Sequence, residues 1–236
     1  MIKKFKIEFL FLGLLALNIF IAYNVDIGFY NFFKNFNESI QSIYLKKFFI
    51  QITVLGDSKW YFTISLIFLF LGLLAHRKEQ FSKYKAYIDK VIKFNFFLFS
   101  SLLITGIITQ ILKHIVGRPR PNYTNLDQSI GFDFFNMSSN FHSFPSGHTS
   151  TIFTIAIVFS VLLPRSKTIM FLFASIIAFS RIVTGAHFFT DVLGGIIIAF
   201  IGVKFTKILL EKFINFSSSD QSIYLEKNTG YLINVF

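Results

Sequence analysis

Long apolar runs constrain this chain more than any other feature. Six of them lie at approximately 7–24, 60–76, 94–113, 147–163, 168–185 and 188–208. Most are close to the ~20 residues that an α-helix needs to cross the core of a bilayer. A soluble domain carries roughly a quarter charged residues, whereas this chain has 15% charged and 53% hydrophobic residues. The sequence therefore predicts an all-α, polytopic membrane protein with six transmembrane helices in a single membrane domain, 1–236.

Charge and cysteine content narrow the function classes. The formal net charge of +11 is compatible with nucleic-acid binding, but most Lys and Arg residues stand in short segments between the apolar runs. That placement is typical of membrane topology and of contact with anionic lipid headgroups, so no nucleic-acid partner is expected. The chain has no cysteine, which excludes disulfides, thiolate nucleophiles and cysteine-ligated zinc.

The distribution of positive charge predicts an orientation. Most Lys and Arg residues fall at the N-terminus, in the 77–93 loop, in the 164–167 turn and at the C-terminal end. By the positive-inside rule these segments are cytoplasmic, and both termini lie on that side. No small-residue cleavage site follows the first apolar run, which we interpret as an uncleaved membrane helix and not as a signal peptide.

Two segments lie outside this pattern. Within the expected outer loop at 25–58, residues 43–54 fit either an amphipathic helix along the interface or an irregular loop packed on the helices. The segment from about 214 to 236, which contains three consecutive serines, is predicted to be a poorly ordered cytoplasmic tail.

Three polar blocks interrupt the second half of this apolar chain. They are Lys113-(six residues)-Arg120-Pro121, then Pro145-Ser146-Gly147-His148, then Ser180-Arg181-(five residues)-His187-(three residues)-Asp191. Polar groups in or beside membrane helices are costly and are usually functional. Counting helix crossings at 1.5 Å per residue places all three blocks at outer helix ends. The blocks are therefore expected to form one site on the outer face.

The cations in these blocks are candidate phosphate ligands. The guanidinium groups of Arg120 and Arg181 offer a planar fork that matches phosphate oxygens, and Lys113 adds a point charge. Arg118 stands outside this spacing, and we interpret it as a residue that extends into the headgroup region.

The second block is typical of a helix start. Ser146 is placed to cap the helix, and Gly147 lets an anion approach the free amides of its first turn. His148 would then face the same anion.

In the third block, His187 and Asp191 are four residues apart and share a helix face. The carboxylate can bind one imidazole nitrogen and leave the other free to attack. A metal site is the alternative, but only Asp191 offers a nearby carboxylate and three cations would repel a metal ion. His76, His114 and His142 are interpreted as turn and loop residues.

The three blocks together resemble the signature of the type 2 phosphatidic acid phosphatase (PAP2) superfamily, with no departure at any signature position. The resemblance implies that His187 is the nucleophile, that Asp191 orients it, and that His148 serves as general acid and then general base. It implies phosphate binding by Lys113, Arg120, Ser146, Gly147 and Arg181, and it implies no metal or organic cofactor.

The resemblance also implies a bacterial inner-membrane lipid phosphatase with a catalytic core at about 94–208. It would hydrolyse a phosphate monoester or diphosphate of a phosphorylated lipid, with its site facing the periplasm. Residues 117–121 and 132–144 are similar to those of lipid A and phosphatidylglycerophosphate phosphatases, so these activities are favoured. Undecaprenyl-diphosphate phosphatase, lipid phosphotransferase, vanadium haloperoxidase and non-enzymatic transporter remain alternatives, and the oligomeric state is left open.

Overall fold

A computed structural model describes residues 2–38, 42–123 and 132–219, and every regular element in these ranges is helical. The α-helices are α1 (Ile2–Glu38), α2 (Ser42–Ile52), α3 (Ser58–His76), α4 (Lys85–Val116), α5 (Gly147–Leu162), α6 (Lys167–Val183) and α7 (Phe189–Ser219). Short 3₁₀ turns occupy Thr53–Gly56, Glu79–Tyr84, Ser139–Phe141 and Pro164–Ser166. The predicted all-α class is confirmed for the described residues.

The membrane character of the chain is also confirmed, but the number of spans is confirmed only in part. Four helical stretches of the described chain are long and apolar enough to cross a membrane: Ile43–His76, Glu79–Val116, Pro164–Val183 and Phe189–Lys212. The apolar part of α5, Gly147–Val161, is shorter. The remaining predicted run, 7–24, lies in α1, which is not among the four stretches.

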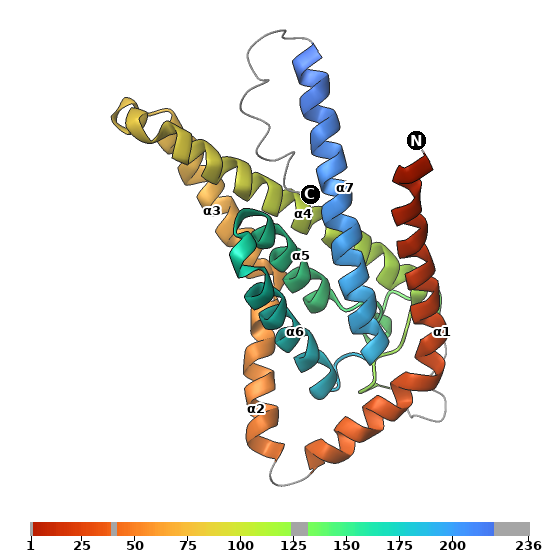
Figure 1. Ribbon diagram of the computed structural model, residues 1–236. Coiled ribbons are helices and arrows are strands. Elements are labelled where there is room, and N and C mark those ends of the chain that lie inside the picture. Colours follow the sequence, from red (N-terminus) through yellow and green to blue (C-terminus); the bar gives the residue numbers. More distant parts are fainter. Residues whose placement is uncertain (1, 39–41, 124–131, 220–236) are drawn as a thin grey trace.

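Helix α5 lies at the centre of the bundle and packs against α4, α6 and α7 (Figure 1). Its length of 16 residues is enough to pass through the interior, and Pro164 then opens the tight turn into α6. Val158 on α5, Ile177 on α6 and Ala199 on α7 are fully buried together. Because lipid tails are as apolar as these side chains, close packing holds the helices together in a membrane more than water exclusion does.

Small and hydroxyl-bearing residues allow α4, α5 and α7 to approach closely. A Cβ on Gly202 of α7 would lie 2.2 Å from the Thr105 hydroxyl of α4, so only glycine fits there. The Thr154 hydroxyl donates to the Thr105 hydroxyl at 3.2 Å, and that of Thr109 donates to Ser150 at 3.1 Å. Both contacts satisfy polar groups within apolar helices, and they align α4 with α5 below the polar blocks.

The described part of residues 2–56 is more regular than the sequence indicated. Helix α1 turns near its middle, and its second half runs along the end of the bundle where α6 and α7 meet (Figure 1). Phe29 of α1 stacks on Phe189 of α7 at 4.8 Å between ring centroids. The helical interpretation of residues 43–54 is correct through Ile52. Helix α7 continues to Ser219, past the predicted start of the tail, and residues 220–236 lie outside the described residues.

Candidate active site

Backbone hydrogen bonds tie the three polar blocks into one end of the bundle. The amide of Arg120 donates to the Asn140 carbonyl at 2.8 Å, and that of Ser143 donates to the Arg118 carbonyl at 2.9 Å. The Ser146 amide donates to the Asp191 carbonyl at 2.9 Å. The convergence expected from helix counting is therefore present: the end of α4 and the starts of α5 and α7 meet.

Gly117 makes the sharp exit from α4 that brings Arg118 and Arg120 back over the bundle. Its φ of 54° is left-handed, a conformation that favours glycine at a helix C-terminus. A Cβ at this position would lie 1.6 Å from the carbonyl oxygen of Asp133. After this turn, Arg118 and Arg120 are two residues apart, and their side chains contact different groups.

Lys113, Arg120 and Arg181, here called the cation cluster, lie on one side of the site. The Lys113 Nζ donates to the His142 carbonyl at 2.6 Å, and Arg120 Nε donates to the Ser139 carbonyl at 3.1 Å. Arg181 Nη1 donates to the Thr53 hydroxyl at 2.8 Å, while its buried Nε has no hydrogen-bond partner in the described chain. The three charges act on one another, since Arg120 and Arg181 both act on Lys113.

Lys113 and Arg181 of the cation cluster are not paired with a carboxylate of the described chain. Across residues 2–38, 42–123 and 132–219, no carboxylate lies within ion-pair distance of Lys113 or Arg181. Lys113 is 7% exposed. Burying cations without a paired carboxylate is unfavourable unless an anion binds them. The arrangement is thus suited to an anion with several oxygen atoms, such as a phosphate group.

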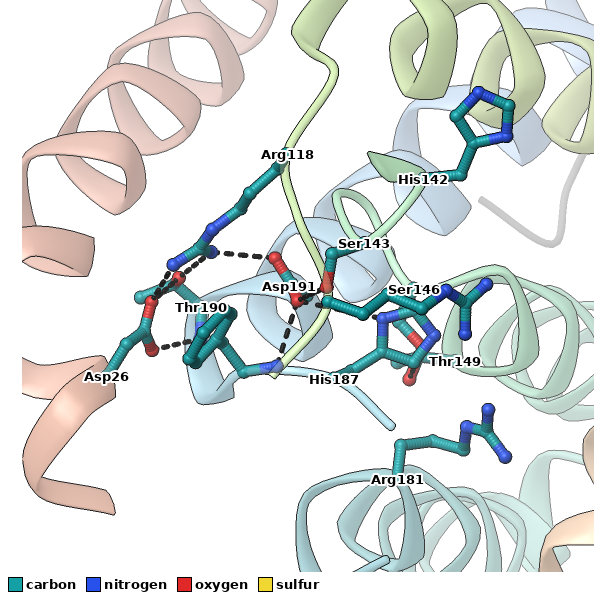
Figure 2. Close-up of polar contacts among 12 residues, drawn as sticks. Asp26, Arg118, His142, Ser143, Ser146, Thr149, Arg181, His187, Thr190 and Asp191 are labelled. Atoms are coloured by element: carbon teal, nitrogen blue, oxygen red, sulfur yellow. Dashed lines mark hydrogen bonds and ion pairs between the residues drawn. The ribbon is translucent and has the colours of Figure 1, made fainter. Parts of the chain in front are cut away.

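His187 and Asp191 stand at the entrance to α7 and are both buried. The His187 Nδ1 lies 3.6 Å from Asp191 Oδ2, which is ion-pair distance but too long for a hydrogen bond. Figure 2 shows the imidazole between Asp191 and the side from which Arg181 approaches. Burial lowers the pKa of His187 to about 3, although the nearby Asp191 carboxylate opposes this shift. The ring is therefore neutral near pH 7, and Nε2 is free of the carboxylate.

The second block begins α5 as predicted, but its serine acts differently. Ser146 occupies the N-cap position, yet its side chain makes no capping bond. Its hydroxyl accepts from the Thr149 hydroxyl at 3.0 Å. The Gly147 backbone lies beside the Lys113 side chain, with 3.8 Å between an added Cβ and Cε. An anion bound by Lys113 would therefore lie close to the start of α5.

His148 is half-buried in the first turn of α5, within electrostatic range of all three members of the cation cluster. Gly56 of the 3₁₀ turn before α3 packs on it, and an added Cβ would lie 2.9 Å from the His148 Cβ. Gly56 thus lets the segment before α3 pack directly on the imidazole.

The sequence-based interpretation of Arg118 as a residue that extends into the headgroup region is wrong. Arg118 does not extend to lipid headgroups, because its side chain is only 3% exposed. Nη1 donates to Asp191 Oδ1 at 2.7 Å, and Nη2 donates to Asp26 Oδ2 at 2.6 Å (Figure 2). Although burial opposes its charge, Asp191 and Asp26 raise the pKa of Arg118 above its ordinary value.

Sequence reasoning missed three further residues that contact this group. Asp26, placed in the expected outer loop, lies on α1 and is 1% exposed. Thr190 bridges Asp26 and Arg118, and the Ser143 hydroxyl donates to Asp191 Oδ2 at 2.5 Å. An isolated acid among aromatic residues was the available signal for Asp26. No comparable signal marked Ser143 or Thr190.

A family model described as the PAP2 superfamily matches residues 94–214, which is just over half of the chain. The protein therefore belongs to the PAP2 superfamily.

Individual relatives extend this result. The chain is 30% identical over 145 residues to a lipid A 1-phosphatase from Rhizobium etli, with 61% of this chain and 62% of that protein aligned. The chain thus spans about three fifths of the length of that curated relative.

Solved structures share the fold. The crystal structure of Aquifex aeolicus LpxE matches with a TM-score of 0.52 and 27% identity, over 77% of this chain and 93% of that one. A transmembrane PAP2-type phosphatidylglycerolphosphate phosphatase from Bacillus subtilis matches with a TM-score of 0.57 and 22% identity, over 90% and 98% of the two chains. At that identity the second match supports the fold alone.

Proposed function

We propose that this protein is an integral-membrane lipid phosphatase that works through a phosphohistidine. The observation that carries this proposal is the position of His187, whose Nδ1 lies 3.6 Å from the Asp191 carboxylate and whose ring lies within electrostatic range of Lys113 and Arg181. A neutral, buried imidazole beside two cations that have no carboxylate within ion-pair distance in the described chain has both the nucleophile and the charge that phosphoryl transfer needs. Similarity to a lipid A 1-phosphatase supports a phosphorylated lipid as the substrate.

In the first half of the reaction, Lys113, Arg120 and Arg181 hold the phosphate, with the Ser146 hydroxyl and the Gly147 backbone amide next to it. The His187 Nε2 attacks phosphorus, a P–N bond forms, and the bond to the leaving oxygen breaks. His148 gives its proton to that oxygen. The cations stabilise the charge on the phosphoryl oxygens in the transition state, which is commonly the largest contribution to such catalysis.

In the second half, water attacks the phosphohistidine. His148, now neutral, takes a proton from the water, and the P–N bond breaks to return His187 and release inorganic phosphate. Asp191 stabilises the positive charge on the imidazole throughout. No step requires a metal or an organic cofactor.

The proposed substrate is a lipid A-type 1-phosphate, with phosphatidylglycerol phosphate as the next class. Its acyl chains would lie against the apolar helices while the phosphate meets the cation cluster. The cluster contacts only phosphate, so a lipid diphosphate such as undecaprenyl diphosphate is the second candidate. A panel of purified lipid A, phosphatidylglycerol phosphate, phosphatidic acid and prenyl diphosphates, assayed for phosphate release, ranks these substrates by kcat/KM.

We place the protein in the bacterial inner membrane with six spans, the four apolar stretches together with α5 and α1. Both termini are cytoplasmic and the site faces the periplasm, because the charged segments lie at the opposite end. A reporter fused after Lys212 should give a cytoplasmic signal. A periplasmic signal would invert the topology.

The covalent mechanism has a direct test. His187→Ala should abolish phosphate release, a loss of at least about a thousandfold, because no other group replaces the nucleophile. Wild-type protein incubated with ³²P-labelled lipid and quenched in alkali should carry label, and His187→Ala should carry none. His76→Ala is the matched control, since His76 pairs with Asp89 at the far end of α3. Activity retained in His187→Ala would exclude this mechanism.

A further inference from the structure

Arg118 lies at the centre of a buried ion network that reaches beyond the PAP2 match. The network comprises Asp26, Arg118 and Asp191, whose side chains are at most 3% exposed. Arg118 uses one terminal nitrogen for each carboxylate, at 2.6 and 2.7 Å. Its guanidinium also lies over the Phe188 ring, 4.3 Å from the centroid. Such a planar fork can bridge two carboxylates, which a lysine ammonium cannot reproduce.

Asp26 brings the first helix into this network. It lies on α1, outside the residues 94–214 that match the family. Its Oδ1 accepts from the Thr190 amide at 2.9 Å, and its Oδ2 accepts from the Thr190 hydroxyl. Asp26 therefore binds both Arg118 and the first turn of α7, one residue before Asp191.

The network fixes the Asp191 carboxylate. Oδ1 accepts from Arg118, while Oδ2 accepts from the Ser143 hydroxyl at 2.5 Å and from the Phe188 amide at 2.8 Å. With both oxygens held, the carboxylate cannot rotate away from His187. The 3.6 Å separation between Oδ2 and His187 Nδ1 is thus set by groups outside the cation cluster.

The charge of the network also matters at the imidazole. Two carboxylates and one guanidinium leave a net charge of −1 in a buried environment beside His187. A buried Asp191 carboxylate without a cationic partner would be unfavourable unless it were protonated. Arg118 keeps it ionised, and Asp26 restores the negative charge that Arg118 removes. A net negative group next to the ring stabilises the positive charge that appears when Nε2 attacks phosphorus.

We infer that Arg118 and Asp26 are positioning residues for the reaction at His187, and that α1 thereby completes the active site. Arg118 holds Asp191 in its orientation, and Asp26 holds Arg118 and supplies the remaining negative charge. This inference rests on the proposed phosphohistidine chemistry. It assigns Arg118 a role separate from that of the cation cluster, because both of its terminal nitrogens are bonded within the network.

The separation of roles predicts a split between turnover and binding. In Asp26→Asn, which keeps the shape of the side chain, kcat should fall about tenfold to a hundredfold. The KM for the lipid substrate and the Ki of inorganic phosphate should stay within twofold of wild type, because the cation cluster is unchanged. Arg118→Lys keeps the charge but cannot bridge both carboxylates, and it should show the same split.

The test measures kcat, KM, phosphate Ki and the unfolding temperature of detergent-purified wild type, Asp26→Asn and Arg118→Lys. Asn18→Ala is the matched control on α1. Asn18 is also buried, and its side chain donates to the Thr190 carbonyl at 2.8 Å. Among the described residues it makes no hydrogen bond to Arg118 or to a carboxylate. Asn18→Ala should lower the unfolding temperature and leave kcat unchanged in the folded protein.

Two results would overturn the inference. One is a wild-type kcat in folded Asp26→Asn or Arg118→Lys. The other is a parallel rise in KM and phosphate Ki, which would mean that Arg118 acts on the substrate. If either variant fails to fold, the other decides the outcome. If wild type itself releases no phosphate from any lipid, the proposed function fails and the positioning role fails with it, whereas an active wild type with unaffected variants overturns the positioning role alone.

Discussion

Two groups of charged side chains adjoin His187, and they are organised in contrasting ways. In the buried ion network, each charge has a partner of opposite sign at 2.6–2.7 Å. In the cation cluster, Lys113 donates to a carbonyl and Arg181 to a hydroxyl. Neither has a carboxylate within ion-pair distance in the part of the chain that the structure describes. The charges of the network are thus paired within the protein, whereas those of Lys113 and Arg181 are, in the proposed mechanism, available to an anion.

The contrast has an energetic consequence. Removing one member of a neutralised buried pair leaves an uncompensated charge and typically costs 3–5 kcal/mol of stability. Removing one cation from a repulsive cluster relieves repulsion, so in the proposed mechanism it should lower activity with little change in stability. Substitution in the buried ion network should lower stability as well as kcat, and three experiments test that difference.

The largest effect is expected in the cation cluster. Arg181→Ala should lower kcat/KM about a hundredfold to a thousandfold, because a guanidinium that holds the phosphoryl oxygens is lost. Its unfolding temperature should stay close to that of wild type, since among the described residues the Arg181 side chain makes one hydrogen bond, to the Thr53 hydroxyl. Arg181→Lys, which keeps the charge, should retain more activity. A variant with lower stability and wild-type activity would contradict the contrast.

The second-largest effect is expected in the pH dependence of stability, and it depends on His187. Its pKa is lowered to about 3 in the folded protein, mainly by burial, from an ordinary value of 6.5. Between these values the unfolded chain binds a proton that the folded protein does not, so this contribution to stability decreases as the pH falls. Across pH 4–6 the unfolding free energy of wild type should fall more steeply than that of His187→Gln, by about 1.4 kcal/mol per pH unit.

Denaturant unfolding of both proteins in detergent at several pH values measures this difference. The other titrating groups are the same in the two chains, which makes His187→Gln a matched reference. Equal slopes would show that His187 is not held neutral and would remove one basis for its role as the nucleophile.

The smallest effect is expected at the edge of the buried ion network. Ser143→Ala removes the hydroxyl that donates to Asp191 Oδ2, while Arg118 and the Phe188 amide still hold the carboxylate. We expect stability to fall by about 1.5 kcal/mol, typical of a hydrogen bond to a charged group. The kcat should fall no more than about tenfold. Ser138→Ala, whose hydroxyl accepts from the exposed Asn140 amide at 3.4 Å, is the control and should change neither quantity.

A loss in Ser143→Ala as large as that in Arg181→Ala would mean that the two regions act as one unit. A loss of stability with unchanged kcat would instead limit Ser143 to a structural role.

The sequence by itself determined the helical membrane class, the convergence of the three blocks and the cation cluster. Helix length, apolar composition and the count of crossings are local properties, and they place the ends of α4, α5, α6 and α7 without knowledge of packing. The spacing of the blocks in turn identified Lys113, His148 and His187. Each of these residues lies at the helix end that the crossing count indicated.

Only the tertiary structure decided which cations are neutralised. Arg118 and Arg120 are two residues apart and equally basic, and the block spacing singled out Arg120 without showing that Arg118 would be buried and paired. The turn at Gly117 directs Arg118 to Asp26 of α1, whereas Arg120 donates to the Ser139 carbonyl in the loop before α5. Because Asp26 lies 92 residues from Arg118 along the chain, the pairing depends on how α1 packs against α7. Local sequence patterns do not encode that packing.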